Sequence, residues 1–318
     1  MKKERFTLGV SQQGTIVGYK WYNPSCYFFK GVVILVHGMA EHIERYDEFA
    51  QTLAKEGYIV YGHNQRGHKD SIKSDNDYGY MSDNDNFSIL VTDLKEIYDY
   101  IQKEYLTLPI YMFGHSMGSF VVQRFAQLYG SRIQGIILSG SAKNPKLSLF
   151  MGMLLAGIIK RCKGPKSRSK LLYNLIFGSF NKRYKPNRTK YDWLNSVPDE
   201  VDKYCADKYC GGIFTSVFYR DFFRGLYELN LNYDLIPKEL PIFIISGKAD
   251  PVGGSSKLVK RLYRKYNRLG ITNLKFKLYP QARHEIIHEV CKGEVYADCL
   301  NWLDRIRENN PRTKKINL

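Results

Sequence analysis

Cysteine is sparse in this chain of 318 residues, and the thiols are scattered along it. The sequence contains six, namely Cys26, Cys162, Cys205, Cys210, Cys291 and Cys299. Domains held by disulfides carry closely and regularly spaced cysteines, so a disulfide framework is excluded and reduced thiols are expected. Cys205 and Cys210 also lack the spacing of a zinc ribbon, and we expect both to be buried thiols.

Long hydrophobic runs are absent as well. The longest apolar segment, Leu147–Ile159, is shorter than the roughly 20 residues that a membrane-spanning helix needs. Charged and polar residues follow Met1, whereas a secretory signal has an apolar stretch of about 7–15 residues near its start. The expectation is therefore a cytoplasmic protein, with peripheral contact to a membrane left open.

Acidic residues are fewer than basic residues in this chain. There are 48 Lys and Arg against 31 Asp and Glu, which gives a formal net charge of +17. The basic stretch Lys160–Lys190 contains eleven Lys or Arg residues and no acidic residue. No helix-turn-helix, zinc or RNA-recognition signature accompanies this charge, so no nucleic-acid partner is expected. Two interpretations stay open: a solvated basic face, or a surface that contacts an anionic membrane.

Short apolar runs that end in turn residues alternate with longer amphipathic segments. The runs predict strands at 32–36, 58–61, 110–113, 136–138, 242–245 and 274–278. Helical periodicity is present at 47–56, 87–104, 116–129 and 290–306. Continuous apolar strands joined by helical crossovers are typical of buried parallel strands. The predicted fold class is α/β, with a mostly parallel, doubly wound sheet that an N-terminal antiparallel hairpin precedes.

About a hundred residues separate the fourth predicted strand from the fifth, although a crossover needs only a dozen or so. We interpret residues 142–240 as a helical cap inserted between two parts of the core, 1–141 and 241–318. The cap contains the apolar segment Leu147–Ile159, the basic stretch and an aromatic-rich helix at 214–231. A solvated helix would not be apolar on nearly all sides, so the apolar segment is either buried core or a lid over an acyl-chain tunnel.

The sharpest chemical motif lies between the predicted strand at 110–113 and the helix after it. Gly114-His115-Ser116-Met117-Gly118 reads G-x-S-x-G. A serine at the tip of such a tight turn is strained, and the flanking glycines permit close approach of strand and helix. Its hydroxyl would project beyond the carboxyl edge of the sheet, where open α/β sheets bind ligands. Ser116 is therefore the candidate nucleophile; the alternative is a serine that merely caps the helix.

A serine hydroxyl is a weak nucleophile unless an imidazole takes its proton and an acid orients that imidazole. Asp250 and His284 each follow a late predicted strand, in the chain order Ser, Asp, His that this strand–turn–helix motif uses. Both would lie at the same sheet edge as Ser116, which makes them the candidate acid and base. The alternative for Asp250 is an ordinary turn aspartate before Pro251.

The negative oxygen that develops during acyl transfer needs backbone N–H donors. Met117 follows the candidate nucleophile at the start of its helix, and Met39 lies in the turn after the first long strand. These two amides are the expected oxyanion donors. Four other histidines are expected to support turns and loops, namely His37, His63, His68 and His115.

Several motifs, taken in order, carry a resemblance to a known family. They are His37–His42 with Arg45-Tyr46, Arg66-Gly67-His68 before Ser71, Gly114–Gly118, Lys248–Pro251 and His284-Glu285. Together they resemble the monoacylglycerol lipase and lysophospholipase branch of the α/β-hydrolase family, over nearly the full chain. The resemblance implies the α/β-hydrolase fold, a catalytic triad of Ser116, Asp250 and His284, and oxyanion donors at Met39 and Met117. No cofactor and no metal are expected.

The chain departs from the family pattern at two positions. Lys69 stands where the family usually has the second glycine of a Gly-His-Gly motif, and His288 stands where it often has asparagine. The cap is the most variable part of such proteins. These differences leave the choice of substrate open.

A competing motif overlaps the candidate base. His284-Glu285-Ile286-Ile287-His288 reads H-E-x-x-H, the zinc-peptidase signature, which needs one helix through all five residues and a third ligand further on. Asp298, Asp304 and Glu308 are the available acids. The motif follows a strand and Pro280 directly, so His284 is expected in a turn rather than a helix.

An apolar cap segment beside a basic cluster is the composition of a segment that rests on an anionic membrane. The predicted function is therefore a serine carboxylic-ester hydrolase acting on a lipid-like ester of monoacylglycerol or lysophospholipid type, and a peripheral contact of Lys160–Lys190 with an anionic membrane stays open. Two further alternatives remain. The same triad could cleave an amide, as in aminopeptidases of this superfamily, or the scaffold could bind a membrane without turnover.

Overall fold

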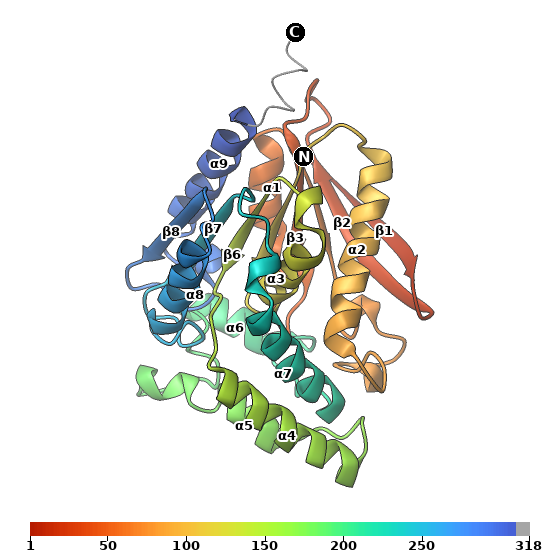
Figure 1. Ribbon diagram of the computed structural model, residues 1–318, viewed down its shortest axis with the longest axis vertical. Helices are drawn as coiled ribbons and strands as arrows, with labels where there is room; N and C mark the ends of the chain where they lie inside the picture. Colours follow the sequence, from red (N-terminus) through yellow and green to blue (C-terminus); the bar gives the residue numbers. More distant parts are fainter. Residues whose placement is uncertain (310–318) are drawn as a thin grey trace.

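An eight-stranded sheet forms the centre of the computed structural model, which describes residues 1–309 (Figure 1). The strand order is β1-β2-β4-β3-β5-β6-β7-β8. Strands β1 (Lys2–Val10) and β2 (Gly14–Tyr22) form an antiparallel hairpin, and β2 runs antiparallel to β4. The remaining strands pair in parallel and are β3 (Gly31–Val36), β4 (Tyr58–His63), β5 (Ile110–His115), β6 (Gly135–Ser139), β7 (Ile242–Gly247) and β8 (Leu274–Tyr279). The predicted α/β class and N-terminal hairpin are confirmed.

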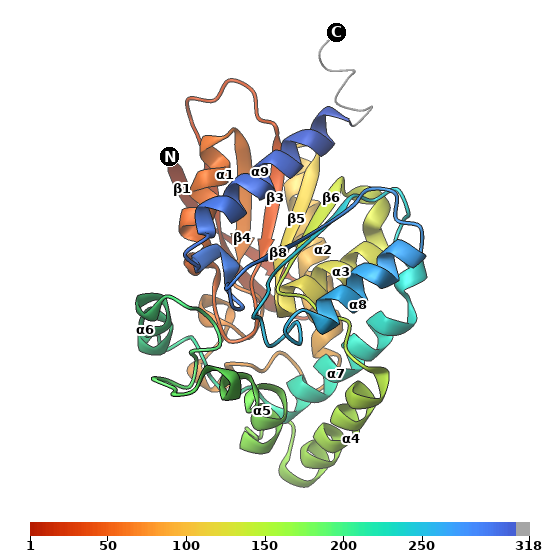
Figure 2. The same cartoon turned by 90° about the vertical axis from the view of Figure 1, so that its left-hand side faces the viewer.

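Helices cover both faces of the sheet (Figures 1 and 2). One face carries α1 (Asp47–Lys55) and α9 (Lys292–Glu308), and the other carries α2 (Asn86–Glu104), α3 (Met117–Tyr129) and α8 (Lys257–Arg268). Successive strand side chains point to opposite faces, so Val33 of β3 packs in the α1/α9 core and Ile34 in the α2/α3 core. Strands β3 to β7 are buried on both faces, and they are therefore apolar at consecutive positions.

The predicted elements match the observed ones closely, and α8 is the one core helix that was not predicted. Val259, Leu262 and Tyr266 form its buried stripe, at the spacing of a helix. Basic residues occupy most of the positions between them, so the segment resembles a solvated linker when its composition alone is considered. The helical spacing of its few apolar residues is the signal that could have identified it.

Four helices between β6 and β7 lie beyond one end of the sheet (Figures 1 and 2). They are α4 (Lys146–Lys163), α5 (Lys170–Phe177), α6 (Pro198–Ala206) and α7 (Ser216–Leu231). Helix α7 packs against α2 and α3, and α4 packs on α7. This is the part of the chain predicted as a cap at 142–240; the second predicted core part, 241–318, extends past the described residues.

Short 3₁₀ helices complete the connections between the longer elements. They are η1 (Ile43–Tyr46), η2 (Lys69–Ser71), η3 (Asp75–Asp77), η4 (Gly130–Arg132), η5 (Phe180–Tyr184), η6 (Tyr233–Leu235) and η7 (Ile286–His288). Within residues 1–309, no helix combines the length and the apolar character required to cross a membrane.

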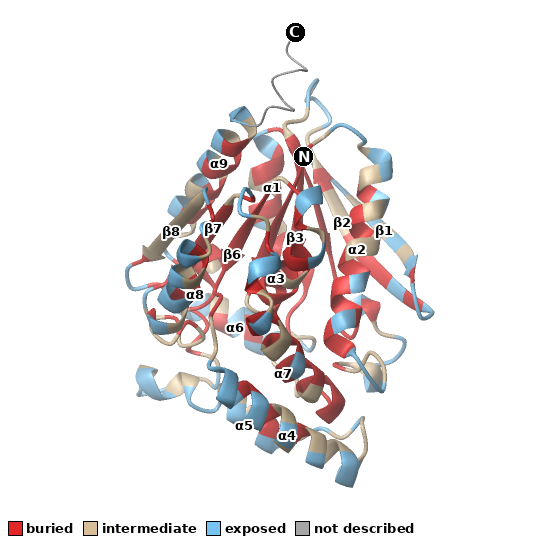
Figure 3. Cartoon of the chain, viewed as in Figure 1, coloured by how far each residue is buried: buried red, intermediate tan, exposed pale blue. Residues whose placement is uncertain are grey.

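Helix α4 has two different apolar faces (Figure 3). Leu149, Gly152 and Ala156 are buried, and a Cβ atom at Gly152 would lie only 2.9 Å from the Phe223 ring of α7. The opposite face is open to solvent, with exposed fractions of 72% for Leu147, 56% for Met151, 44% for Leu154 and 60% for Ile158. Each predicted alternative therefore describes part of α4, because one face packs on α7 and Leu149, Met151 and Leu155 line the cavity described below.

Replacement of Ile244 by alanine is expected to destabilise the fold strongly, because this side chain is fully buried in β7. Ile244→Ala should lower the free energy of unfolding by about 2–5 kcal/mol. Ile158→Ala is the matched control, since Ile158 is exposed, and it should change stability by about 0.5 kcal/mol or less. Urea denaturation followed by circular dichroism measures both. Equal losses would contradict the described burial.

Candidate active site

Ser116 lies between β5 and α3 in a backbone conformation that non-glycine residues rarely adopt. Its φ and ψ angles are 50° and −118°. The Ser116 N–H donates to the carbonyl oxygen of Ser139 over 2.9 Å, and its own carbonyl accepts from the Ser119 N–H over 3.0 Å. Such strain persists only where surrounding contacts determine the geometry, and it is concentrated at functional sites.

Two glycines permit this turn because helix and strands meet there. A Cβ atom at Gly114 would lie 2.6 Å from the carbonyl oxygen of Gly118. One at Gly118 would lie 2.1 Å from the carbonyl oxygen of Val36 in β3. Both obstacles are backbone atoms, which cannot move aside as a flexible side chain could. The G-x-S-x-G motif is therefore a steric requirement of this fold.

Asp250 and His284 lie in contact, after β7 and β8. Nδ1 of His284 is 3.0 Å from Oδ1 of Asp250, and the two side chains are almost completely buried. Asp250 Oδ1 also accepts the N–H of Val252 over 2.8 Å, and Oδ2 accepts the hydroxyl of Ser246 over 3.2 Å. These bonds fix the carboxylate, which in turn directs Nδ1–H of the imidazole toward itself and leaves Nε2 for other partners.

The surroundings of His284 come from both the core and the cap. Its ring centroid lies 4.6 Å from that of His115 and 5.3 Å from that of Trp193. The carbonyl oxygen of Leu194 accepts the N–H groups of His284 and Glu285 over 3.0 and 2.8 Å. Trp193 and Leu194 were not predicted as site residues, because no local motif links these cap residues to a turn ninety positions later.

Burial and charge act in opposite directions on the two neighbouring imidazoles. Burial alone would lower the pKa of His284, but the negative charge and hydrogen bond of Asp250 outweigh it and raise the pKa above its ordinary value. Burial, together with the nearby His284, lowers the pKa of His115 well below its ordinary value. His115 is therefore neutral, and its Nδ1 lies 3.1 Å from the Ser139 hydroxyl.

The turn Gly38–Ala40 after β3, here called the oxyanion turn, lies against Ser116. A Cβ atom at Gly38 would be 3.2 Å from Cβ of Ser116, which shows how closely the backbones approach. Met39 and Met117 both line the cavity that Ser116 faces. The two predicted oxyanion amides thus flank the candidate nucleophile, while their catalytic role stays a prediction.

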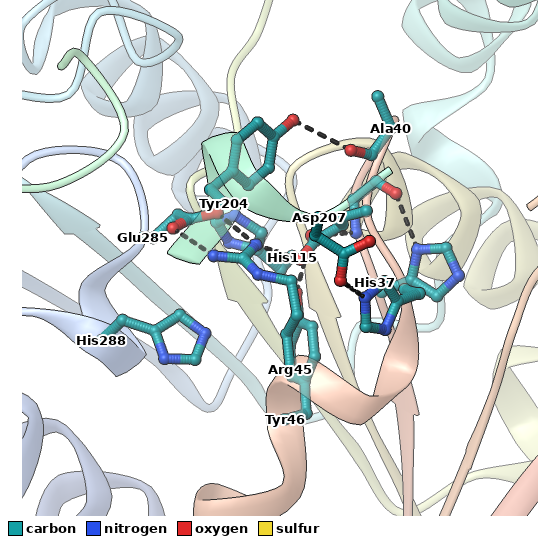
Figure 4. A network of polar contacts seen from close by, with 12 residues as sticks. His37, Ala40, Arg45, Tyr46, His115, Tyr204, Asp207, Glu285 and His288 are labelled. Atoms are coloured by element: carbon teal, nitrogen blue, oxygen red, sulfur yellow. Dashed lines mark hydrogen bonds and ion pairs between the residues drawn. The ribbon is translucent and has the colours of Figure 1, made fainter. Parts of the chain in front are cut away.

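A buried cation connects this turn with the turn that carries His284 (Figure 4). Arg45 donates to Glu41 Oε2 over 2.8 Å. It also donates to both carboxylate oxygens of Glu285, and the bond to Oε2 measures 2.7 Å. Burial would raise the pKa of Glu285, but Arg45 lowers it below its ordinary value. For Glu41, burial and the charge of Glu285 prevail over Arg45 and raise the pKa. The guanidinium of Arg45 therefore outweighs burial at Glu285 but not at Glu41.

Ser116, His284, Met39 and Met117 line one cavity of about 1000 Å³, whereas Asp250 is buried behind His284. Core residues Ser116 and His284 line it together with apolar side chains of α4, α5 and α7, namely Leu149, Met151, Leu155, Leu175, Ile176, Phe222, Phe223 and Leu226. Ser116 is partly exposed within it. The structure thus brings the three candidate triad residues to one sheet edge and places an apolar chamber over them.

The H-E-x-x-H motif lacks the helix that a zinc peptidase needs. Residues Ile286–His288 form only a 3₁₀ turn, and α9 begins at Lys292. His284 is bonded to Asp250 and Glu285 to Arg45, so neither is arranged as that signature requires. The zinc alternative is therefore not supported by the geometry.

Among the described residues, one group of three has ligand atoms close enough for a metal ion: His42, Asp207 and Cys210, within 4.8 Å of one another. Both ring nitrogens of His42 already contact carboxylates, Nδ1 with Glu44 at 2.9 Å and Nε2 with Asp207 at 2.7 Å. Lys69, at a φ of 37° where the family has glycine, pairs with Glu44 over 2.8 Å. A cationic neighbour of this kind disfavours a metal ion.

Two smaller expectations also have an outcome. The prediction of buried thiols is wrong for Cys205, which is exposed, whereas Cys210 is half-buried. The expected structural role of His37 is confirmed, because its Nδ1 lies 2.7 Å from the carbonyl oxygen of Gly38 and its Nε2 accepts the N–H of Gln65 over 2.9 Å.

A mostly parallel sheet in this strand order, with a strained serine directly after β5, defines the α/β-hydrolase class. The family model described as serine aminopeptidase, S33, matches residues 29–290, and the chain belongs to this family. The predicted fold and the predicted enzyme class, a serine hydrolase, are confirmed.

Curated relatives and solved structures agree with this assignment. The chain is 25% identical to a monoacylglycerol lipase of Mycolicibacterium smegmatis, over 86% of this chain and 88% of that protein. It is also 25% identical to the monoglyceride lipase of Rattus norvegicus, over 88% and 87%. The fold matches a carboxyl esterase from Bacillus coagulans with a TM-score of 0.86, at 21% identity and 96% and 99% coverage. A monoglyceride lipase variant from Saccharomyces cerevisiae gives 0.76, at 18% identity and 96% coverage of both chains.

The pKa of His284 is expected to depend on the charge of Asp250. In the wild type the pKa should be raised above its ordinary value, and Asp250→Asn should lower it, because the charge and hydrogen bond that offset burial most strongly are lost while only the charges of Glu285 and Glu41 still oppose burial. Titration of the histidine side chains by NMR measures both values, with His284→Gln to assign the resonance. His115 is the internal control and should stay neutral in both proteins. An unchanged His284 titration would show that the two groups are not electrostatically coupled.

Proposed function

We propose that this serine hydrolase cleaves a lipid-borne carboxylic ester, of the monoacylglycerol or lysophospholipid type, through Ser116, His284 and Asp250. The observation that carries the proposal is that Ser116 and His284 line one cavity whose other walls are mostly apolar. Its volume of about 1000 Å³ is at the upper end of the range for small-molecule sites, roughly 300–1,000 Å³. An acyl chain suits such walls, and relatives named as monoacylglycerol lipases support this substrate class.

In the first half of the reaction, Ser116 Oγ attacks the ester carbonyl carbon while Nε2 of His284 accepts the hydroxyl proton. The Asp250 carboxylate stabilises the imidazolium, in keeping with the raised pKa of His284. The N–H groups of Met39 and Met117 donate to the carbonyl oxygen as it becomes negative. His284 then gives the proton to the leaving alkoxide, so that the alcohol departs and an acyl-serine remains.

In the second half, water attacks the acyl-serine. His284 accepts a proton from that water and returns it to Ser116 Oγ as the acyl–oxygen bond breaks. The products are a fatty acid and the regenerated enzyme, and no cofactor takes part in the balance.

We also propose that the cap rests on an anionic membrane. The exposed apolar face of α4 continues in Leu171 and Leu175 of α5, which are 59% and 53% exposed. Arg161 and Lys163, at the C-terminal end of α4, are exposed beside this face. Apolar side chains can enter the lipid boundary while the cations contact anionic head groups, each contributing about 1 kcal/mol. The basic stretch Lys160–Lys190 would then contact the surface from which the substrate is taken.

Ser116→Ala is expected to reduce kcat for a long-chain nitrophenyl ester or a monoacylglycerol by at least about 10⁴-fold, because the nucleophile is removed. Ser148→Ala is the matched control, since Ser148 lines the same cavity from α4. An alkyl phosphonate should label Ser116 in the wild type. Retained turnover in Ser116→Ala would overturn the proposal, and faster turnover of the matched anilide than of the ester would favour an amidase.

Membrane contact is expected to depend on the exposed face of α4. The double variant Leu147→Ser, Ile158→Ser should weaken binding to phosphatidylserine-containing vesicles by at least about tenfold, because two apolar side chains are lost from the boundary. Binding of the wild type should weaken as the salt concentration rises, and it should be weaker to vesicles of phosphatidylcholine alone than to vesicles that contain phosphatidylserine. Leu106→Ser with Leu128→Ser is the control, since both residues are exposed elsewhere, at 79% and 47%. Equal effects of both double variants in vesicle sedimentation would contradict a specific surface.

A further inference from the structure

The oxyanion turn is anchored on both sides of Met39. On the core side, the Gly38 N–H donates to Glu41 Oε1 over 2.6 Å, and the Tyr46 hydroxyl donates to the same oxygen over 3.0 Å. Glu41 is held in place by Arg45 over 2.8 Å. The residue before Met39 is thus fixed by a buried carboxyl group whose own position is determined.

The anchor on the other side comes from the cap. The carbonyl oxygen of Ala40 accepts two hydrogen bonds of 2.9 Å each, one from the Tyr204 hydroxyl of α6 and one from the Gly211 N–H (Figure 4). Ala40 itself has a φ of 57°, in the left-handed region that non-glycine residues avoid. A strained residue keeps such a conformation only when its neighbours hold it, and here cap residues provide the hold.

Two more contacts attach the same cap segment, residues 204–211, to the core. The ring of Tyr204 stacks over the guanidinium of Arg45, with the Arg45 Cζ atom 4.9 Å from the ring centroid. Asp207 Oδ2 lies 2.7 Å from Nε2 of His42, two residues after Ala40. Tyr204 is 5% exposed, so its hydroxyl bond to Ala40 is shielded from water and not easily replaced by solvent.

We infer that Tyr204 is a positioning residue for the oxyanion turn: through the Ala40 carbonyl, it holds the turn so that the Met39 N–H points at the developing oxyanion. The inference rests on the proposed function of Ser116. It makes the cap part of the catalytic apparatus, because the Met39 donor is correctly placed only when residues 204–211 are docked on the core. A role of this kind affects the transition state more than the bound substrate.

Tyr204→Phe tests the inference, because it removes the hydroxyl and keeps the ring over Arg45. Loss of a complete oxyanion donor costs roughly 100–1,000-fold in kcat, so a displaced donor is expected to cost about tenfold. KM should change by less than about twofold, since ground-state contacts are retained. Affinity for an alkyl boronic acid, which forms a tetrahedral adduct on serine, should fall by about the same factor as kcat.

Tyr98→Phe is the matched control, because its hydroxyl also contacts a backbone carbonyl, that of Arg132 over 3.0 Å, together with Gln102 Oε1 over 2.9 Å, and Tyr98 does not line the cavity. It should leave kcat, KM and boronate affinity unchanged. Asp207→Asn weakens the other attachment of the same cap segment and should also lower kcat several-fold without raising KM. Thermal melting shows whether Tyr204→Phe folds. If it does not, the same measurements on Asp207→Asn test the inference instead.

Three results would overturn the inference: unchanged kcat in both cap variants, a rise in KM at constant kcat, or unchanged boronate affinity. A rise in KM alone would make Tyr204 a substrate contact. These outcomes are distinct from failure of the proposed function, which would appear as turnover in Ser116→Ala whatever residue 204 is.

Discussion

The close approach of α3 to β3 and β5 is the constraint on which the site depends. A side chain at Gly118 would meet the backbone of Val36, and one at Gly114 would meet the backbone of Gly118. Because helix and strands meet there, Ser116 is forced into its unusual backbone conformation at the edge of the sheet. The same edge carries the turns with Asp250 and His284, since parallel strands end side by side. Backbone sterics thus select both the place and the orientation of the candidate nucleophile.

The cap does more than cover the cavity. Its Leu194 carbonyl holds the backbone of His284, and its Tyr204 hydroxyl holds the oxyanion turn. Helix α4 lines the cavity with Leu149, Met151 and Leu155, and it exposes Leu154 and Ile158 to solvent. One insertion therefore combines substrate enclosure, positioning of core turns and a surface suited to a lipid boundary. This combination is the physical reason for expecting that changes in the cap alter turnover as well as substrate choice.

Buried charge connects these parts. Arg45 lies between Glu41, which supports the oxyanion turn, and Glu285, which follows His284. Removal of one partner from a buried charge cluster leaves an uncompensated charge, which is strongly destabilising. The cluster also stacks under Tyr204 of the cap. Two turns and helix α6, which are distant in the chain, are thereby held in one arrangement around a single guanidinium.

The amino-acid sequence alone determined the strand–helix alternation, the G-x-S-x-G turn and the order of Ser116, Asp250 and His284, because each is a local pattern of apolar residues, glycines or strand-exit turns. Helix α8 was not predicted, because its few buried apolar residues are separated by basic residues. Only the tertiary structure decided that Nδ1 of His284 lies 3.0 Å from Asp250 and that Leu194 and Tyr204 support the site. It alone also separated the packed and exposed faces of α4. Those contacts join segments far apart in the chain, and they depend on how an insertion without a periodic signature packs on the sheet.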